Sequence, residues 1–341
     1  ALEQELRVAL QERQFVLHYQ PQVDRQGEVV GVEALNPWQH PNRGLVPPGG
    51  SIELAEQTGL IVPIGMWALE ESCLQLERWR HDPRYAHLQI SVNVSARQFR
   101  KSDFADEVRK VLIDTGAHPS RLKLELTESL LYERAGDTLG KMKSLSAIGV
   151  QFSLDDFGTG FTSLSYMAQL PLNQLKIDKL FVHCIGTHPK VEQIIRTLIG
   201  MAANLEVEVV AEGVETGAQL AFLHTHGCNL CQGFLFGKPM TVAEFEARSS
   251  RTPSPAKARA RTAMSQVFTC DEHGVVLRGI REVLSEAVDI RVTGEAGDAA
   301  QLKDLLRTVP CDVLVMELAL SGRGGLDVLA GLTDSGSPVK V

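Results

Sequence analysis

Short apolar or alternating runs recur along the first part of the chain, and longer amphipathic stretches separate them. Helical periodicity is clearest at Val62–Arg80 and Val191–Leu205, where apolar side chains share one face. The runs of strand length are Phe15–Gln20, Val29–Leu35, Leu88–Val94, Leu122–Thr127, Val150–Leu154, Gln174–Ile177, Glu208–Ala211 and Gly233–Phe236. The pattern predicts repeated strand–helix units.

The connection between the first two predicted strands is the four-residue segment Asp24-Arg25-Gln26-Gly27. Because this segment is too short for a crossover helix, the two strands are expected to form a hairpin. Eight strands in about 245 residues favour a TIM-like (β/α)₈ barrel with one irregular antiparallel strand. A doubly wound sheet is the alternative architecture.

The composition changes at residues 249–265, which are rich in Ser, Pro, Ala and Arg and poor in large apolar residues. This segment is predicted to be a flexible linker, with a basic nucleic-acid-binding arm as the alternative. Beyond it, a helix at Val276–Ala287 lies among strands at Val267–Cys270, Ile290–Gly294 and Asp312–Met316, and this segment is interpreted as a β–α–β–α–β pattern. The predicted divisions are residues 1–248, the linker 249–265 and a smaller α/β domain at 266–341.

The overall composition is that of an ordinary globular protein, with 44% apolar residues, 22% charged residues and a net charge of −8. The negative charge argues against a large nucleic-acid surface. We expect a cytoplasmic protein without membrane segments, because no apolar run has spanning length and the N-terminus lacks the features of a signal peptide. The six cysteines are irregularly spaced; Cys228 and Cys231 are interpreted as packed residues, with a zinc or redox site as the alternative.

Polar side chains gather where the predicted strands end, and in a barrel these ends meet at one mouth. They are Glu33, Asn93, Glu125, Glu128, Asp155, Asp156, Lys176, Asp178, Glu212 and Glu215, while Gln232 lies at the start of the predicted eighth strand. Any one of these acids could be an ordinary surface residue. Together the carboxylates would repel one another unless cations neutralised them, and their oxygen ligands suit Mg²⁺ or Mn²⁺. The pair Asp155-Asp156 suits two ions that clamp the water and the leaving oxygen of a phosphodiester.

The segment Asp155-Asp156-Phe157-Gly158-Thr159-Gly160 places two glycines next to two acids. This pattern is typical of a tight loop over a site. A glycine-rich phosphate cradle is the competing interpretation, although no Gly-Lys-Ser or Gly-Lys-Thr follows.

The first domain resembles the EAL domain family of cyclic-di-GMP phosphodiesterases over roughly residues 2–248. The segments that carry this resemblance are Tyr19-Gln20-Pro21, Glu33-Ala34-Leu35, Asn93-Val94-Ser95, Glu125-Leu126-Thr127-Glu128-Ser129, Asp155 to Gly160, Lys176-Ile177-Asp178, Ala211-Glu212-Gly213-Val214-Glu215 and Gln232-Gly233. The resemblance implies a TIM-like barrel that hydrolyses cyclic di-GMP to linear pGpG.

The resemblance also implies residue roles. Metal ligands would be Glu33, Asn93, Glu125 and Asp155 for one ion, and Asp155, Asp156 and Glu212 for the other. Lys176 and Glu212 would activate water, and Glu128 would anchor the loop at residues 155–165, which couples the metals to a dimer contact in the family. Substrate contacts would come from Gln20, Leu35, Asp178, Glu215 and Gln232. The implied partners are cyclic di-GMP and a second copy of the chain, with no membrane and no nucleic acid.

The sequence departs from the family pattern at two places. Pro37 stands where the family has an arginine that contacts a substrate phosphate, and loss of that charge-assisted contact is expected to weaken substrate binding by roughly 10- to 100-fold. Gly49-Gly50 replaces an acidic and aromatic stretch and is expected to loosen the next helix. The hypothesis is retained but weakened catalysis; the alternative is a cyclic-di-GMP-binding regulator that acts through protein contacts.

The second domain resembles a truncated response-regulator receiver. The matching segments are Asp271-Glu272-His273, Gly294 to Asp298 and Ser321 to Leu326. Glu317 stands where receivers carry the phosphate-accepting aspartate, and its longer side chain misplaces the carboxylate. A decayed remnant or a docking surface is therefore favoured over phosphorylation.

Overall fold

The computed structural model describes residues 2–46, 48–131, 135–157, 164–249, 265–285, 290–308, 311 and 313–316. The chain divides into two compact units, Ala1–Ser249 and Ser250–Val341. No helix in the described part of the chain is long and apolar enough to cross a membrane.

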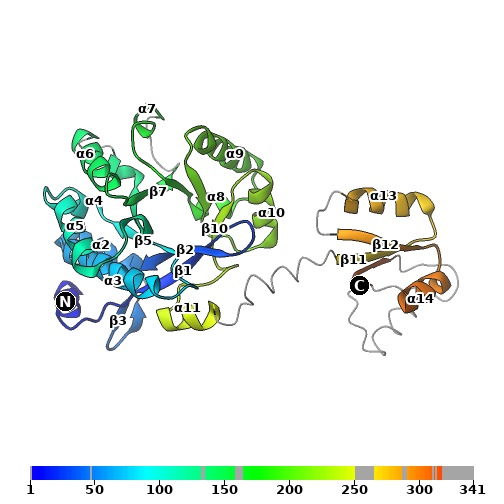
Figure 1. Ribbon diagram of the computed structural model, residues 1–341, viewed down its shortest axis with the longest axis horizontal. Helices are drawn as coiled ribbons and strands as arrows, with labels where there is room; N and C mark the ends of the chain where they lie inside the picture. Colours follow the sequence, from blue (N-terminus) through cyan, green and yellow to red (C-terminus); the bar gives the residue numbers. More distant parts are fainter. Residues whose placement is uncertain are drawn as a thin grey trace. The chain divides into compact units, whose positions relative to one another are not determined.

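The first unit is a closed barrel of eight strands with helices around it (Figure 1). The strand order is β1-β10-β9-β8-β7-β6-β5-β2. The bounds are β1 (His18–Val23), β2 (Val29–Leu35), β5 (Gln89–Val94), β6 (Leu122–Thr127), β7 (Gln151–Phe157), β8 (Gln174–Ile177), β9 (Glu208–Ala211) and β10 (Leu230–Gln232). β1 pairs antiparallel with both β2 and β10, and the other pairs are parallel, so the predicted barrel with one irregular strand is confirmed.

The remaining elements of this unit connect and cover the strands. The helices are α1 (Leu2–Gln11), α2 (Pro48–Thr58), α3 (Ile61–Arg80), α4 (Ala96–Phe99), α5 (Phe104–Thr115), α6 (Ala135–Ser146), α7 (Leu164–Met167), α8 (Lys179–Val182), α9 (Pro189–Asn204), α10 (Gly217–Thr225) and α11 (Val242–Ser249), with 3₁₀ turns η1 (Pro119–Arg121) and η2 (Glu128–Leu131). A separate hairpin pairs β3 (Trp38–His40) with β4 (Gly44–Val46). The helix α2 begins at Pro48, so Gly49 and Gly50 lie inside its first turn.

Residue alternation explains why the barrel has a polar interior. On β6, Leu122, Leu124 and Leu126 are fully buried in the main apolar core, which lies between strands and helices. Because successive side chains of a strand point to opposite faces, Lys123 and Glu125 point into the barrel. The alternating positions therefore deliver polar groups to both ends of the barrel, which are called here the C-terminal and N-terminal mouths after the ends of the parallel strands.

Two strand predictions were wrong in position. The segment Gly233–Phe236 is a turn, and the eighth strand is the short β10, so Gln232 ends this strand instead of starting it. A Cβ on Gly233 would lie 2.2 Å from the backbone of Val214, so only glycine allows this turn to pack there. The first strand begins at His18, because Phe15 packs with Trp38 in a separate apolar cluster near the N-terminus.

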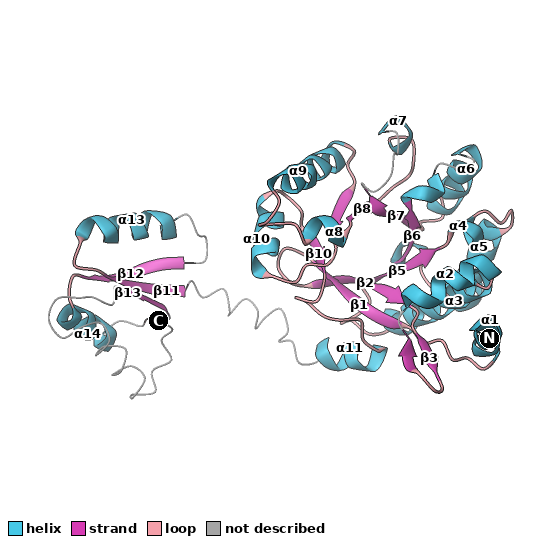
Figure 2. Ribbon diagram, turned by 180° about the vertical axis from the view of Figure 1, so that it is seen from behind, coloured by secondary structure: helices cyan, strands magenta, loops and turns pink. Residues whose placement is uncertain are grey.

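The second unit contains a three-stranded parallel sheet in the order β12-β11-β13. Its elements are β11 (Ser265–Cys270), α13 (Gly274–Ser285), β12 (Ile290–Ala296), α14 (Ala299–Thr308) and β13 (Val313–Met316). The helices α13 and α14 lie on opposite sides of the strands (Figure 2). This arrangement is the predicted β–α–β–α–β order, whereas Glu317 and the segment Ser321 to Leu326 lie outside the described residues.

Candidate active site

The C-terminal mouth of the barrel holds a buried lysine surrounded by carboxylates. Lys176 on β8 is 1% exposed. Its Nζ lies 2.6 Å from Glu212 Oε1 and 2.7 Å from Glu125 Oε2, and 3.4 Å from both Glu33 Oε2 and Asp155 Oδ1. Residues from β2, β6, β7, β8 and the end of β9 therefore meet at one point, as expected for the ends of parallel strands.

An amide network orients Glu33 from the opposite side. Asn93 donates a hydrogen bond to Glu33 Oε1 at 2.7 Å, and Gln232 donates one to Glu33 Oε2 at 2.6 Å. The Gln232 amide also donates to Gln20 Oε1, and it accepts a hydrogen bond from Gln22. Both oxygens of Glu33 are thus fixed by donors in addition to the ammonium of Lys176. Gln22 was missed by the sequence analysis, although it alternates with Gln20 on the same strand.

The pKa values show that one ammonium does not neutralise four carboxylates. Burial raises the pKa of Glu125 well above its usual range, and the charges of Glu33 and Asp155 add to this effect against Lys176. Burial also raises the pKa of Glu212 to about 7. Burial opposes ionisation of Glu33 too, but Lys176 and hydrogen bonds from Gln232 and Asn93 outweigh it and lower that pKa. The single positive charge of Lys176 is therefore too little to balance the four carboxylates.

The four carboxylates also raise the pKa of Lys176 well above its ordinary value, although burial alone would lower it. The lysine therefore carries its proton in this environment. Glu125 Oε1 is buried and has no hydrogen-bond partner among the described residues. An uncompensated carboxylate oxygen in the interior costs free energy, and a cation at this position would remove that cost.

The other predicted site residues lie near the mouth in different roles. Asp178 caps α8, because its Oδ1 accepts a hydrogen bond from the backbone N–H of Leu180 at 2.6 Å. Glu215 is about half exposed, and its Oε1 lies 3.8 Å from His183 Nε2.

Leu35 ends β2, and Glu128 is buried at the start of η2. The side chain of Asp156 and residues 158–163 lie outside the described residues, so the predicted loop and the second half of the predicted metal site are only partly described.

Within the described residues, no group of three or more His, Cys, Asp or Glu side chains is arranged to hold a metal ion by itself. The carboxylates instead form ion pairs with the ammonium of Lys176. In the CxxC pair, Cys228 and Cys231 are fully buried, and the Cys228 thiol donates to the backbone oxygen of Leu230 at 3.3 Å. The interpretation of these cysteines as packed residues agrees with this burial.

The fold and the geometry of the candidate site together define a TIM-like barrel with an acidic C-terminal mouth. The sequence matches the family model of the EAL domain over residues 3–239, and the chain belongs to this family. The relatives include the bifunctional diguanylate cyclase/cyclic di-GMP phosphodiesterase MucR of Pseudomonas aeruginosa, which is 46% identical over 244 residues, or 71% of this chain and 36% of MucR. The cyclic di-GMP phosphodiesterase PdeR of Escherichia coli is 41% identical over 72% of this chain and 37% of PdeR.

Solved structures agree with this assignment. A structure described as the PaMucR phosphodiesterase in a c-di-GMP complex has a TM-score of 0.70 and 44% identity, and it aligns with 72% of this chain and 99% of its own. The EAL enzyme Bd1971, in its cAMP and cyclic-di-GMP bound form, also has a TM-score of 0.70, with 32% identity over 73% of this chain and 68% of its own. The chain spans about a third of the length of the curated relatives named above. The resemblance of the second unit to a receiver stays a prediction.

Proposed function

We propose that the chain hydrolyses cyclic di-GMP to linear pGpG. The observation that carries this proposal is the convergence of Glu33, Glu125, Asp155 and Glu212 at one barrel mouth, with a buried and unpartnered oxygen on Glu125. Names of relatives as cyclic di-GMP phosphodiesterases supply the substrate class.

The residues of the mouth fit divalent cations. The donor set is carboxylate oxygen plus the Asn93 amide, which suits Mg²⁺ or Mn²⁺ better than zinc. Glu33, Asn93, Glu125 and Asp155 would hold one ion, and Asp155, Asp156 and Glu212 would hold the second. When bound, two such ions lower the pKa of water and stabilise charge on the phosphoryl oxygens.

The side chains of the protein are assigned the remaining steps of the reaction. Water attacks the phosphorus and loses a proton, the P–O3′ bond breaks, and the departing O3′ takes up a proton from solvent as pGpG is released. Because Lys176 is enclosed by carboxylates and keeps its proton, we assign to it the orientation of water and the neutralisation of charge. The Glu212 carboxylate, which is less buried than that of Glu125, is assigned to accept the proton of the attacking water.

Substrate contacts are assigned to Gln20, Leu35, Asp178, Glu215 and Gln232. Asp178 is assigned an indirect part, since its carboxylate already caps α8. Glu128 is assigned to anchor the loop at residues 155–165. A homodimer formed through this unit and a cytoplasmic location complete the proposal.

The test is a hydrolysis assay with Mn²⁺ that follows pGpG formation. Glu33→Ala serves as the blank, and Glu53→Ala on the exposed face of α2 serves as the matched control. We expect product from the wild type and from Glu53→Ala and none from Glu33→Ala. No product from the wild type at high protein concentration would refute the proposed activity.

Binding without turnover is the second candidate function, and Pro37 is the observation that favours it. Pro37 is buried beside β3, and its carbonyl oxygen accepts a hydrogen bond from the backbone N–H of Val16. The proline side chain carries no positive charge. Calorimetric titration of cyclic di-GMP, run beside the turnover assay with the same metal, separates the two functions, because a regulator would bind without forming product.

A further inference from the structure

The N-terminal mouth of the barrel, at the end opposite the proposed active site, contains a polar cavity of about 640 Å³. Strands β1, β2, β5, β6, β7, β8, β9 and β10 all contribute to its wall or rim. Gly31 lies in the wall, where a Cβ would meet the backbone oxygen of Gln89 at 3.2 Å. A side chain at residue 31 would therefore crowd the cavity, which its glycine leaves open.

Two hydrogen-bond donors that line this cavity have no partner among the described residues. Lys123 on β6 is 2% exposed, and it forms no hydrogen bond or ion pair with any described residue. Gln174 on β8 is fully buried; its Oε1 accepts a hydrogen bond from Ser153 at 3.3 Å, whereas its Nε2 has no partner in the described part of the chain. The amide nitrogen of Gln174 is buried without an acceptor, which is costly, and the ammonium of Lys123 ends a buried side chain in the same cavity, so one acceptor placed there would serve both donors.

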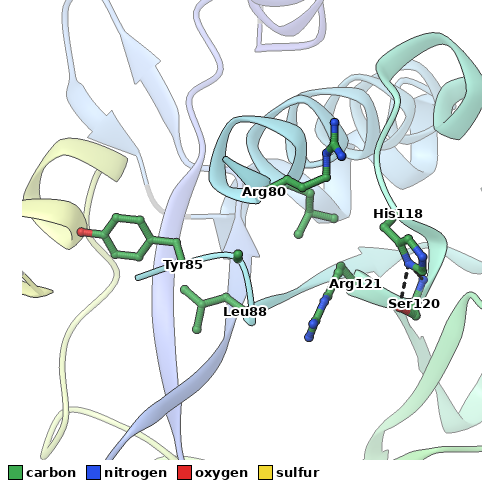
Figure 3. Close-up of a pocket in the computed structure, with 8 residues that line it drawn as sticks. Arg80, Tyr85, Leu88, His118, Ser120 and Arg121 are labelled. Atoms are coloured by element: carbon green, nitrogen blue, oxygen red, sulfur yellow. Dashed lines mark hydrogen bonds between the residues drawn. The ribbon is translucent and has the colours of Figure 1, made fainter. Parts of the chain in front are cut away.

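In a neighbouring cavity, by contrast, the polar side chains are hydrogen-bonded to other groups of the protein. This cavity, of about 220 Å³, contains Arg80, His118 and Arg121 (Figure 3). Arg80 is bound by the carboxylate of Glu77 at 2.8 and 2.9 Å, and Arg121 donates to the backbone oxygen of His87. The guanidinium groups of Arg80 and Arg121 point away from each other (Figure 3). Its donors have partners and do not converge, so the smaller cavity carries no site.

We propose that the N-terminal mouth is a second ligand site, which binds a small oxyanion between the side chains of Lys123 and Gln174. A carboxylate or phosphate group would accept from both donors at once, and such charge-assisted hydrogen bonds are the strong ones. The rim carries the carboxylates of Asp24, Glu206 and Glu208 against one guanidinium, that of Arg121, which lines both cavities, so the net negative rim disfavours highly charged anions. The site therefore takes a small molecule with one anionic group, and this site is distinct from the one proposed for cyclic di-GMP.

The test is calorimetric titration of the Mg²⁺-loaded full chain with inorganic phosphate and, separately, with acetate. The arm that shows the tighter binding identifies the head group. Lys123→Met is expected to weaken binding of that probe by roughly 10- to 100-fold, because one charge-assisted contact is lost. The matched control is Lys110→Met on the exposed face of α5, which should bind as the wild type does. Phosphate that binds equally to Lys123→Met and wild type binds outside the second site, at the mouth for which metal ions are proposed.

A second variant keeps the test decisive even if Lys123→Met fails to fold. Gln174→Glu is nearly isosteric, and it replaces the amide donor by a carboxylate that repels an anion bound beside it and attracts the ammonium of Lys123. We expect this variant to lose probe binding and to unfold at a higher temperature than the wild type. Failure of the wild type to bind either probe, or equal binding by wild type, Lys123→Met and Gln174→Glu, would overturn the second site while leaving the proposed hydrolysis untouched.

Discussion

Two buried lysines, one toward each mouth of the barrel, have opposite surroundings. Lys176 at the C-terminal mouth lies within 3.4 Å of four carboxylate oxygens from different residues, whereas Lys123 at the N-terminal mouth has no ion pair among the described residues. The pKa of Lys176 is raised well above its ordinary value, because the four carboxylates outweigh burial. The pKa of Lys123 is lowered, because burial outweighs distant carboxylates. The C-terminal mouth thus has more carboxylates than its one ammonium neutralises. The N-terminal mouth has an ammonium, on Lys123, without a hydrogen-bond acceptor among the described residues.

The largest effect is expected from Lys176→Met. Loss of the ammonium leaves four carboxylates close together, and breaking a buried ion network costs about 3–5 kcal/mol of unfolding free energy. Denaturant unfolding without added metal measures this loss. Mg²⁺ should raise the melting temperature of Lys176→Met more than that of the wild type, because cations then replace the missing charge. An unchanged stability in both conditions would contradict the charge balance inferred for this mouth.

The next effect is expected from Glu125→Gln. This near-isosteric change removes one proposed metal ligand, and kcat/KM for cyclic di-GMP should fall by more than about 100-fold. Glu53→Gln on an exposed helix position is the control in the same assay. Activity of Glu125→Gln within a few-fold of wild type would remove Glu125 from the metal site.

Pro37→Arg tests whether the missing arginine weakens substrate binding at the C-terminal mouth. A new charge-assisted contact with a substrate phosphate should lower the KM by roughly 10- to 100-fold. Pro37→Ala is the control, since it removes the proline without adding charge and should leave the KM close to that of wild type. A KM that does not change with arginine would refute the explanation given for this position.

The smallest effect is expected from Lys123→Met when no anion is added. Replacing a lysine whose side chain is buried without a partner among the described residues by an apolar side chain of similar length should raise the free energy of unfolding by about 1 kcal/mol. Chemical denaturation beside Lys176→Met makes the comparison direct. If both variants lost stability to the same extent, the two lysines would have equivalent surroundings and the contrast between the mouths would be wrong.

The barrel could be predicted from the sequence because, after the β1–β2 hairpin, strands alternate with helices and because the strand ends carry polar residues. The eighth strand was misplaced for an equally local reason. Phe234, Leu235 and Phe236 form an apolar run that predicts a strand, yet Phe234 is 55% exposed and Leu235 is 40% exposed in the turn after β10. The turn depends on the close approach of Gly233 to Val214, which is a contact between distant segments.

The sequence by itself determined which residue types stand at the ends of successive strands, and therefore that Glu33, Glu125, Asp155 and Lys176 share one mouth. Only the tertiary structure decided which atoms meet. In the folded barrel, the Lys176 ammonium lies among the carboxylates. Lys123 on β6 and Gln174 on β8 are 51 positions apart in the sequence, but they line one cavity, where neither donor has an acceptor among the described residues. Alternation along a strand specifies the face to which a side chain belongs, but pairing across the barrel depends on strand register, which is a property of the closed sheet.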